Sequence, residues 1–459
     1  MISSSARRVC RRALGGRHLS TGLDSAAVRE QFPAFAIHPD AVFCDGPGGS
    51  QVPRSVPAAM THYLAGSNAN VGGASVTSDR TLELVTAGRA AAADLMGCAT
   101  REVTYGLNAT SLTFHLSRSL ARQVGPDDNV VVTQLDHDCN VGPWARLAAD
   151  TGAELRFVQV EPGSCRLDME SLRAAVDGRT KLVACGYASN AVGTVNDVAE
   201  VVRVARAAGA LSYVDAVHYA PHGLLDVDAL GCDFLVCSAY KFFGPHAGLL
   251  FGRAPLMEEL DAYRVRPATN ELPSAATWEV SRWELGTLNY EGVAGTTAAI
   301  NYLAGLGGGA ASEGGAPAAG APRRAALARS WQRVAEHEGA LTAQFLRGVA
   351  DIRGVRLFGL GADHLAADMP ADFADAEGAA SLARRRTPTF AMHKEGLTPD
   401  QFAKGLGERG IYCASGNFYA LGLSTRLGVE DAGGWCRLGF LHYNTADEVD
   451  RVLQAIEDV

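Results

Sequence analysis

The sequence predicts an α/β fold: a large domain built on a mostly parallel sheet, followed by a smaller C-terminal α+β domain. Between residues 80 and 251, short apolar runs of strand length alternate with segments of helical periodicity. The apolar runs do not alternate with polar residues, which is typical of strands that helices cover on both faces. With 459 residues, the chain is also long enough for two or three domains.

The large domain should contain a series of β-α-β units. We expect helices at 81–96, 109–120, 144–147 and 198–208. The apolar runs between them predict strands at 130–134, 155–160, 181–187, 211–214 and 234–237. In an open parallel sheet, ligands bind beyond the carboxyl ends of the strands. We therefore expect the functional side chains directly after these runs.

A Gly/Ala/Pro-rich stretch at 305–322 is typical of a surface insertion or flexible linker. Beyond it the sequence predicts a long helix, a polar loop up to residue 386 and a final helix from Ala446. We place the large domain at 24–300 and the small domain at 301–459. The expected elements of the small domain are the helix at 324–349 and strands at 355–358, 389–393 and 436–440.

The first 23 residues differ in composition from the rest of the chain. They contain five arginines and several serines, and no acidic residue precedes Asp24. This composition is typical of an organelle transit peptide, with a disordered basic tail as the alternative. The arginine content and the ending Arg-His-Leu-Ser-Thr favour the mitochondrion over the plastid or the cytoplasm.

Composition and charge exclude several classes of function. An apolar fraction of 47% with 20% charged residues indicates a globular protein. Without the first 23 residues the formal net charge falls from −9 to −14, which disfavours nucleic-acid binding. We expect no membrane-spanning helix, because no apolar run reaches 18 residues. The ten cysteines form no C-x-x-C pair, so no zinc site is expected.

Polar side chains that suit one cofactor follow four of the predicted strands: Lys241, Asp215, His137 and Asn190. A lysine beside an apolar strand is costly as an ammonium, but as a neutral amine it can form a Schiff base. A carboxylate keeps a pyridine nitrogen protonated, an imidazole stacks on the ring, and an amide bonds the 3-oxygen. Singly, each residue has an ordinary structural explanation. Together they predict a pyridoxal phosphate site.

The phosphate of this cofactor needs hydroxyl groups and free backbone N–H groups, as at a helix N-terminus. The segment Gly-Leu-Asn-Ala-Thr-Ser at 106–111 opens a predicted helix and supplies such groups at Asn108 and Ala109. Ser238, three residues before Lys241, should lie nearby.

Two segments resemble the class-V aminotransferase family, and within it the cysteine-desulfurase-like branch. They are Val-Asp-Ala-Val-His-Tyr-Ala-Pro-His at 214–222 and Cys-Asp-Phe-Leu-Val-Cys-Ser-Ala-Tyr-Lys at 232–241. The resemblance runs from Phe43 to the C-terminus, apart from the Gly/Ala/Pro-rich stretch. It implies the type I fold of pyridoxal-phosphate-dependent enzymes, and a homodimer.

The resemblance also implies a role for each residue of the cofactor site. Lys241 would be the Schiff-base lysine, with Asp215 as the pyridinium partner and His137 as the stacking ring. Asn190 would bind the 3-oxygen. His218, where desulfurases usually have glutamine, would meet the same oxygen.

The substrate and the phosphate have implied partners as well. Arg437 falls on the arginine that binds the substrate α-carboxylate, and its planar guanidinium suits a carboxylate. Asn190 is expected beside the substrate. Thr287 resembles the residue that reaches the phosphate of the neighbouring subunit. The rest of the phosphate site is implied at Asn108, Ala109, Ser238 and Tyr240.

The chain departs from the desulfurase pattern in the loop that carries the nucleophilic cysteine of those enzymes. Alignment of 411–420 on that loop places Gly416 on its glycine, Tyr419 on its cysteine and Ala414 on its arginine. A phenol cannot carry the persulfide that sulfur transfer requires. Cys413 lies six residues upstream of Tyr419.

Three functional hypotheses follow. We favour a pyridoxal-phosphate-dependent transferase or lyase that acts on a small amino acid. The second is a cysteine desulfurase that uses Cys413 or an external thiol. The third is a non-catalytic protein that binds the cofactor, which Lys241 and Arg437 argue against, because such a protein needs no carboxylate clamp.

Overall fold

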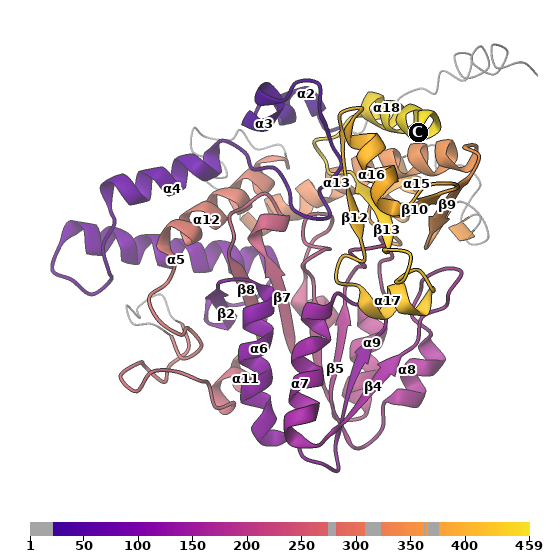
Figure 1. The fold of residues 1–459 in the computed structure, drawn as a ribbon. Helices are drawn as coiled ribbons and strands as arrows, with labels where there is room; N and C mark the ends of the chain where they lie inside the picture. The colour runs from indigo at the N-terminus through magenta and orange to yellow at the C-terminus, as the bar shows by residue number, and fades with distance from the viewer. Residues whose placement is uncertain (1–21, 274–280, 308–322, 362–363, 366–375) are drawn as a thin grey trace, which may run out of the picture.

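The computed structural model describes residues 22–273, 281–307, 323–361, 364–365 and 376–459 (Figure 1). Residues 1–21 of the predicted transit peptide and most of the 305–322 stretch lie outside these residues. Within them, no helix is both long and apolar enough to cross a membrane.

The large domain is built on a mostly parallel sheet, as the sequence predicts. The described residues form seven strands in the order β2-β8-β7-β6-β5-β3-β4. β8 runs antiparallel to both neighbours, and all the other pairs are parallel. The strands are β2 (Val103–Gly106), β3 (Asn129–Thr133), β4 (Glu154–Val158), β5 (Thr180–Gly186), β6 (Leu211–Asp215), β7 (Phe234–Ser238) and β8 (Gly248–Gly252).

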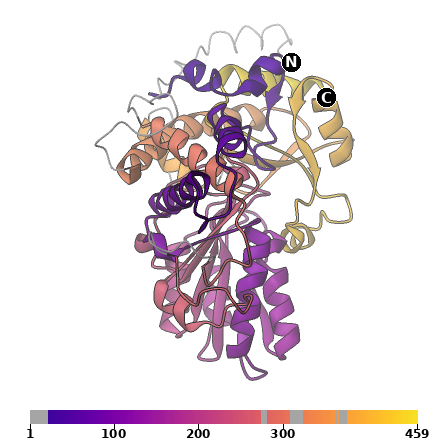
Figure 2. The same ribbon diagram turned by 90° about the vertical axis from the view of Figure 1, so that its left-hand side faces the viewer.

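Each strand expected in this domain is present, with ends displaced by one or two residues. β2 and β8 were not predicted. They are short strands with glycine at their ends, and they pair with each other antiparallel. Helices cover both faces of the sheet (Figures 1 and 2). They are α4 (Ser55–Gly66), α5 (Val76–Met96), α6 (Ala109–Leu120), α7 (Gly142–Thr151), α8 (Met169–Ala175), α9 (Val198–Ala207), α10 (Val227–Leu230), α11 (Ala254–Glu259) and α12 (Tyr290–Gly305).

Local signals explain where several of these helices begin and end. α9 begins after Asp197, whose side chain accepts a hydrogen bond from the N–H of Glu200. α5 begins after Ser75 in the same way and ends at Gly97, whose positive φ of 76° suits glycine.

The small domain is α+β, as expected. Its described residues form an antiparallel sheet in the order β12-β13-β10-β9. The prediction of a polar loop up to residue 386 was wrong in part. This segment contains the helix α15 (Ala376–Ala383), which packs on α13. The strands are β9 (Val355–Phe358), β10 (Thr389–Lys394), β12 (Ala414–Gly416) and β13 (Trp435–Gly439). The other helices are α13 (Arg323–Ala350), α16 (Pro399–Gly407), α17 (Leu421–Arg426) and α18 (Ala446–Asp458).

The N-terminal segment packs against the small domain. α2 (Ser25–Arg29) and α3 (Pro33–Ile37) lie beside α18 (Figure 1), where Arg29 forms an ion pair with Glu448 at 2.8 Å. β1 (Val42–Phe43) then pairs in parallel with β11 (Ile411–Tyr412). The following loop, residues 45–49, therefore lies at the boundary between the two domains.

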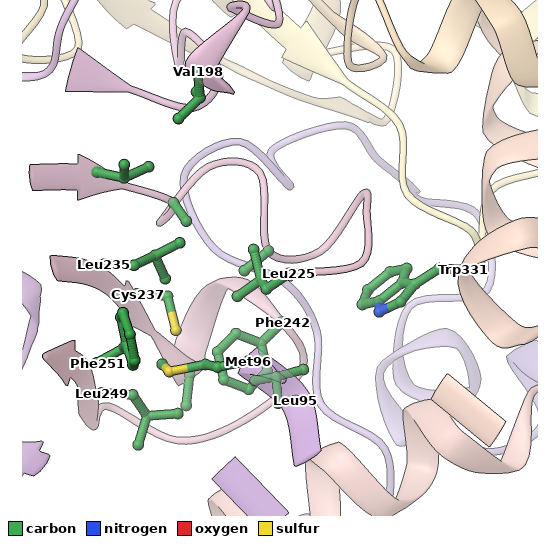
Figure 3. Packing of buried hydrophobic residues seen from close by; sticks show 14 of the residues in the cluster. Leu95, Met96, Val198, Leu225, Leu235, Cys237, Phe242, Leu249, Phe251 and Trp331 are labelled. Atoms are coloured by element: carbon green, nitrogen blue, oxygen red, sulfur yellow. The ribbon is translucent and has the colours of Figure 1, made fainter. Parts of the chain in front are cut away.

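A buried core holds the end of β7 in place. Leu235 and Cys237 of β7 pack with Leu249 and Phe251 of β8 (Figure 3). Phe242, directly after Lys241, is fully buried in the same cluster. The backbone around Lys241 is therefore anchored on both sides by apolar packing.

Candidate active site

Lys241 ends the short 3-10 helix η4 (Ala239–Lys241), which follows β7 directly. Its side chain is buried, and Nζ donates hydrogen bonds to the carbonyl oxygens of Pro47 (2.5 Å) and Gly48 (3.0 Å). Burial lowers the pKa of Lys241 to about 7, and the positive charge of Arg437 acts in the same direction. A substantial fraction of the amine is therefore neutral at pH 7, the form that attacks a carbonyl carbon.

Asp215 ends β6, the strand beside β7. Its Oδ1 accepts a hydrogen bond from the N–H of Val217 (2.8 Å), and its Oδ2 accepts one from the thiol of Cys139 (3.2 Å). Burial raises the pKa of this carboxyl group. Each carboxylate oxygen can accept a further bond, so Asp215 can still bind a protonated ring nitrogen.

His137 follows β3 and precedes the short helix η3 (Asp138–Asn140). Its Nδ1 accepts a hydrogen bond from the backbone N–H of Cys139 at 3.0 Å. Burial lowers the pKa of His137 to about 4, and the positive charges of Lys241 and Arg437 add to that effect. The imidazole is thus neutral at pH 7 and offers a flat, uncharged face.

Asn190 and His218 bring two further polar groups to the same edge of the sheet. Asn190 Nδ2 donates to the carbonyl oxygen of Phe418 at 2.8 Å. His218 Nε2 lies 3.2 Å from the hydroxyl of Thr387 and 3.0 Å from that of Thr389. Asn190 Oδ1 and His218 Nδ1 are buried and have no hydrogen-bond partner among the described residues. Buried polar atoms without partners are uncommon and indicate a ligand or water site.

Arg437 reaches the site from β13 of the small domain. Its Nη1 donates to the backbone oxygen of Asn190 (2.8 Å), and its Cζ lies 3.7 Å from the ring centre of Phe418. A Cβ atom added to Gly48 would lie 3.6 Å from Nη2. Arg437 Nη2 and Lys241 Nζ therefore approach the same glycine. Burial lowers the pKa of Arg437 to about 9, so it stays charged at neutral pH.

The predicted phosphate site lies where α6 begins. Asn108 precedes α6, and its Oδ1 accepts the N–H of Ser111 at 2.8 Å. The N–H of Ala109 donates to Ser238 Oγ at 3.0 Å, which ties α6 to the strand that carries Lys241. The positive end of the helix dipole and its N–H groups suit a phosphate.

The two remaining predicted residues have different surroundings. The ring of Tyr240 lies 5.2 Å from Lys241 Nζ and stacks on His246, with 5.1 Å between ring centres. Thr287 is exposed in the segment before α12, and no hydrogen bond between described residues joins it to the site. Its expected place beside a neighbouring subunit stays a prediction.

Tyr419 and Cys413 lie in different surroundings. Tyr419 is 70% exposed, and its ring centre lies 5.2 Å from that of His137. The thiol of Cys413 lies 3.8 Å from the backbone oxygen of Ala403 and 4.0 Å from Cys436 Sγ. Cys413 therefore packs against the core of the small domain.

Several residues of the site were missed by the sequence analysis. The loop at 45–49 supplies both acceptors for Lys241, and its Asp-Gly-Pro-Gly-Gly sequence after an apolar pair is a turn signal that could have identified it. Phe418, Thr387 and Thr389 carry no such local signal, because only the folded chain brings them to the sheet. Cys139, two residues after His137, was not predicted to take part, although its thiol donates to Asp215.

A family model described as aminotransferase class-V matches residues 42–316. The chain belongs to the class-V aminotransferase family. It is 29% identical to an aminotransferase-like protein, FGM3, of Gibberella zeae, over 94% of this chain and 97% of the relative. It is 30% identical to a probable cysteine desulfurase of Pseudomonas aeruginosa, over 94% and 96% of the two chains.

Solved structures show the same fold. An apo cysteine desulfurase from Thermococcus onnurineus superposes with a TM-score of 0.77 at 24% identity, covering 94% of this chain and 97% of that one. The cysteine desulfurase CsdA of Escherichia coli gives a TM-score of 0.74 at 22% identity, covering 95% and 98%. This class-V aminotransferase family member therefore has the type I fold and is a pyridoxal-phosphate-dependent enzyme.

The residues of the site fit pyridoxal phosphate. Lys241 offers a buried amine, Asp215 a buried carboxylate with capacity for another donor, and His137 a neutral ring. The partnerless His218 Nδ1 lies in the same region, and the start of α6 suits the phosphate. When bound, this cofactor withdraws electrons from a substrate carbon and so stabilises a carbanion there.

Proposed function

We propose that this enzyme acts on a small α-amino acid, whose carboxylate binds Arg437 while its amino group meets the cofactor held by Lys241. The observation that carries the proposal is the approach of Arg437 Nη2 and Lys241 Nζ to the same residue, Gly48. A molecule with a carboxylate and an amine on one carbon spans such a pair of sites. The planar guanidinium suits the carboxylate because it can donate two parallel hydrogen bonds.

The chain's own residues have distinct tasks in this proposal. Lys241, with its pKa lowered to about 7, can remove or return a proton at the substrate α-carbon near neutral pH. Asp215 would keep the ring nitrogen of the cofactor protonated. His137 is neutral at pH 7 and would lie against the cofactor ring, where it would exclude water.

The proposal does not include desulfuration by the usual route. Tyr419 stands at the position of the desulfurase cysteine, and Cys413 contacts Ala403 and Cys436 in the small domain. Sulfur transfer needs an accessible thiolate beside the substrate. These surroundings support transferase or lyase chemistry over desulfuration.

A spectral titration tests the proposal. The purified holoenzyme is mixed with a panel of L- and D-amino acids, and the absorbance of the bound cofactor is followed together with product analysis. We expect at least one small amino acid to change the absorbance and to be converted. If no amino acid changes it, the enzyme does not act on amino acids. If L-cysteine releases sulfide from the wild type and not from Cys413→Ser, desulfuration is the activity.

Two further properties belong to this proposal. We propose a homodimer in which Thr287 approaches the neighbouring site. The proposal is supported by two exposed apolar side chains: Leu285, two residues before Thr287, is 63% exposed, and Leu107, beside the predicted phosphate site, is 72% exposed. The Arg-rich residues 1–23 support import into the mitochondrion. Sedimentation of the holoenzyme and localisation of the tagged full chain test these two points.

A further inference from the structure

The segment Asn417-Phe418-Tyr419-Ala420, here called the aromatic loop, contacts the site from the small domain. It links β12 to α17, which faces the carboxyl ends of the large sheet (Figure 1). The inference drawn from it rests on the proposed function and names the substrate class.

Hydrogen bonds to both domains hold the aromatic loop in place. The backbone oxygen of Tyr419 accepts the N–H of Asp138 at 2.7 Å. That of Phe418 accepts Nδ2 of Asn190 at 2.8 Å. On the side of the small domain, Asn417 Nδ2 donates to both oxygens of Glu430 at 2.9 and 3.2 Å. The loop therefore has a fixed position beside the site.

The backbone of the aromatic loop is unusual. Phe418 and Tyr419 have φ angles of 54° and 58°, in the left-handed region that bulky residues rarely adopt. Such a conformation persists only where surrounding contacts determine it, and it occurs often at functional sites. It directs two consecutive aromatic rings toward the site.

Each of these rings covers a residue of the proposed active site. The ring centre of Phe418 lies 3.7 Å from Arg437 Cζ, on the face of the guanidinium. The ring of Tyr419 lies against His137 at 5.2 Å and an angle of 32°, and the side chain stays 70% exposed. A substrate whose carboxylate meets Arg437 would therefore lie close to these two rings.

Two charged groups close to the rings, Arg437 and Glu430, already have partners. Arg437 uses Nη1 for the backbone oxygen of Asn190 and one face for Phe418, which leaves the Nη2 edge for a single carboxylate. Glu430 accepts hydrogen bonds from Asn417 and Ser424. His137 is neutral near pH 7 because burial lowers its pKa to about 4. A charged substrate side chain would gain no matched partner from these three groups.

We propose that Phe418 and Tyr419 form a fixed aromatic wall that makes the enzyme selective for small amino acids with an uncharged, apolar side chain. The wall contacts the side chain through ring faces, and it holds Arg437 and Asn190 through Phe418. Tyr419 determines specificity, and Phe418 is a positioning residue.

Matched pairs of amino acids test the wall. L-norvaline and L-glutamate have side chains of similar length that differ in charge, as do L-norleucine and L-lysine. The dissociation constant of each is measured from the absorbance of the bound cofactor in wild type, Tyr419→Ala and Tyr419→Phe. Tyr263→Ala serves as the control, because Tyr263 is an exposed tyrosine beside Arg122 in the large domain.

We expect the wild type to bind the uncharged member of each pair at least tenfold more tightly. Tyr419→Ala should reduce this ratio at least fivefold, whereas Tyr419→Phe and Tyr263→Ala should keep it. Equal binding within either pair in the wild type, or an unchanged ratio in Tyr419→Ala, overturns the wall. If no amino acid perturbs the wild-type cofactor, the proposed function fails, and the wall fails with it.

Discussion

The two sides of the active site are built differently. The cofactor side consists of Lys241, Asp215 and His137, each at or within four residues of the carboxyl end of a strand of the large, mostly parallel sheet. The substrate side consists of Arg437 and the aromatic loop, which come from the small domain. The first follows from strand order, whereas the second depends on how two domains pack.

This difference indicates which part of such a site can change without a change in the fold. Strand ends are fixed by the core of the sheet, so a substitution there would disturb the cofactor and the fold together. A loop on the second domain can exchange a thiol for a phenol at one position and leave the sheet intact. Under the proposal that Tyr419 occupies the position of the desulfurase cysteine, the cofactor side is retained while the sulfur carrier is not.

The substitution with the largest expected effect, Lys241→Ala, tests the cofactor side. Lys241→Ala removes the amine that binds the cofactor and moves the proton, so we expect activity to fall at least 1,000-fold, on the order of other losses of a covalent catalyst. Borohydride reduction should then fix no cofactor to the chain. If the variant still carries the cofactor covalently after reduction, another lysine holds it.

Arg437→Gln tests the substrate side alone. Loss of a charge-assisted carboxylate pair costs about 2–3 kcal/mol, so the dissociation constant of the amino acid should rise about 100-fold. Binding of the cofactor should change little, as measured by absorbance. Arg146→Gln is the matched control, because Arg146 is an exposed partner of Asp150. A loss of cofactor binding in Arg437→Gln would mean that the two sides are not separable.

The pH dependence of cofactor capture tests the environment of Lys241. Only the neutral amine reacts, and burial lowers the pKa of Lys241 to about 7, below its ordinary value of about 10.4. The rate of capture by the apoprotein should therefore rise about tenfold per pH unit below 7 and level off above it. Stopped-flow absorbance measures this rate. If the rate of capture continues to rise from pH 8 to 10, the pKa of Lys241 is not lowered and the amine is exposed to solvent.

Asn190→Ala tests the link between the two sides. The amide joins the end of the large sheet to the backbone oxygen of Phe418, and one such hydrogen bond contributes about 1 kcal/mol. We expect amino-acid binding to weaken about fivefold, with a smaller effect on the cofactor. Titrations with the amino acid and with the cofactor measure these two effects. If only cofactor binding weakens, Asn190 belongs to the cofactor side and does not link the two sides.

Most of the large domain could be predicted from the sequence because its signals are local. Apolar runs mark β3, β5, β6 and β7, and a polar residue follows each at the same edge of the sheet. Asn108 caps α6, a pattern that a short stretch of sequence contains. The cofactor side follows from these signals together.

The substrate side had weaker signals, because its contacts join residues far apart in the sequence. Arg437 was found through the family resemblance, yet its contact with Asn190 spans 247 positions. Phe418 was missed, since its role depends on a left-handed backbone and on a partner in the other domain. The helix α15 was missed because a small, alanine-rich segment resembles a loop in composition.

Peptide mapping of two holoenzyme samples tests the central claim most directly: one is reduced with borohydride, and the other is exposed to L-cysteine without reduction and then alkylated. The account predicts cofactor mass on the Lys241 peptide of the first sample, and no added sulfur on any of the ten cysteines of the second. Cofactor on a different lysine, or a persulfide on Cys413 or any other cysteine, would contradict it.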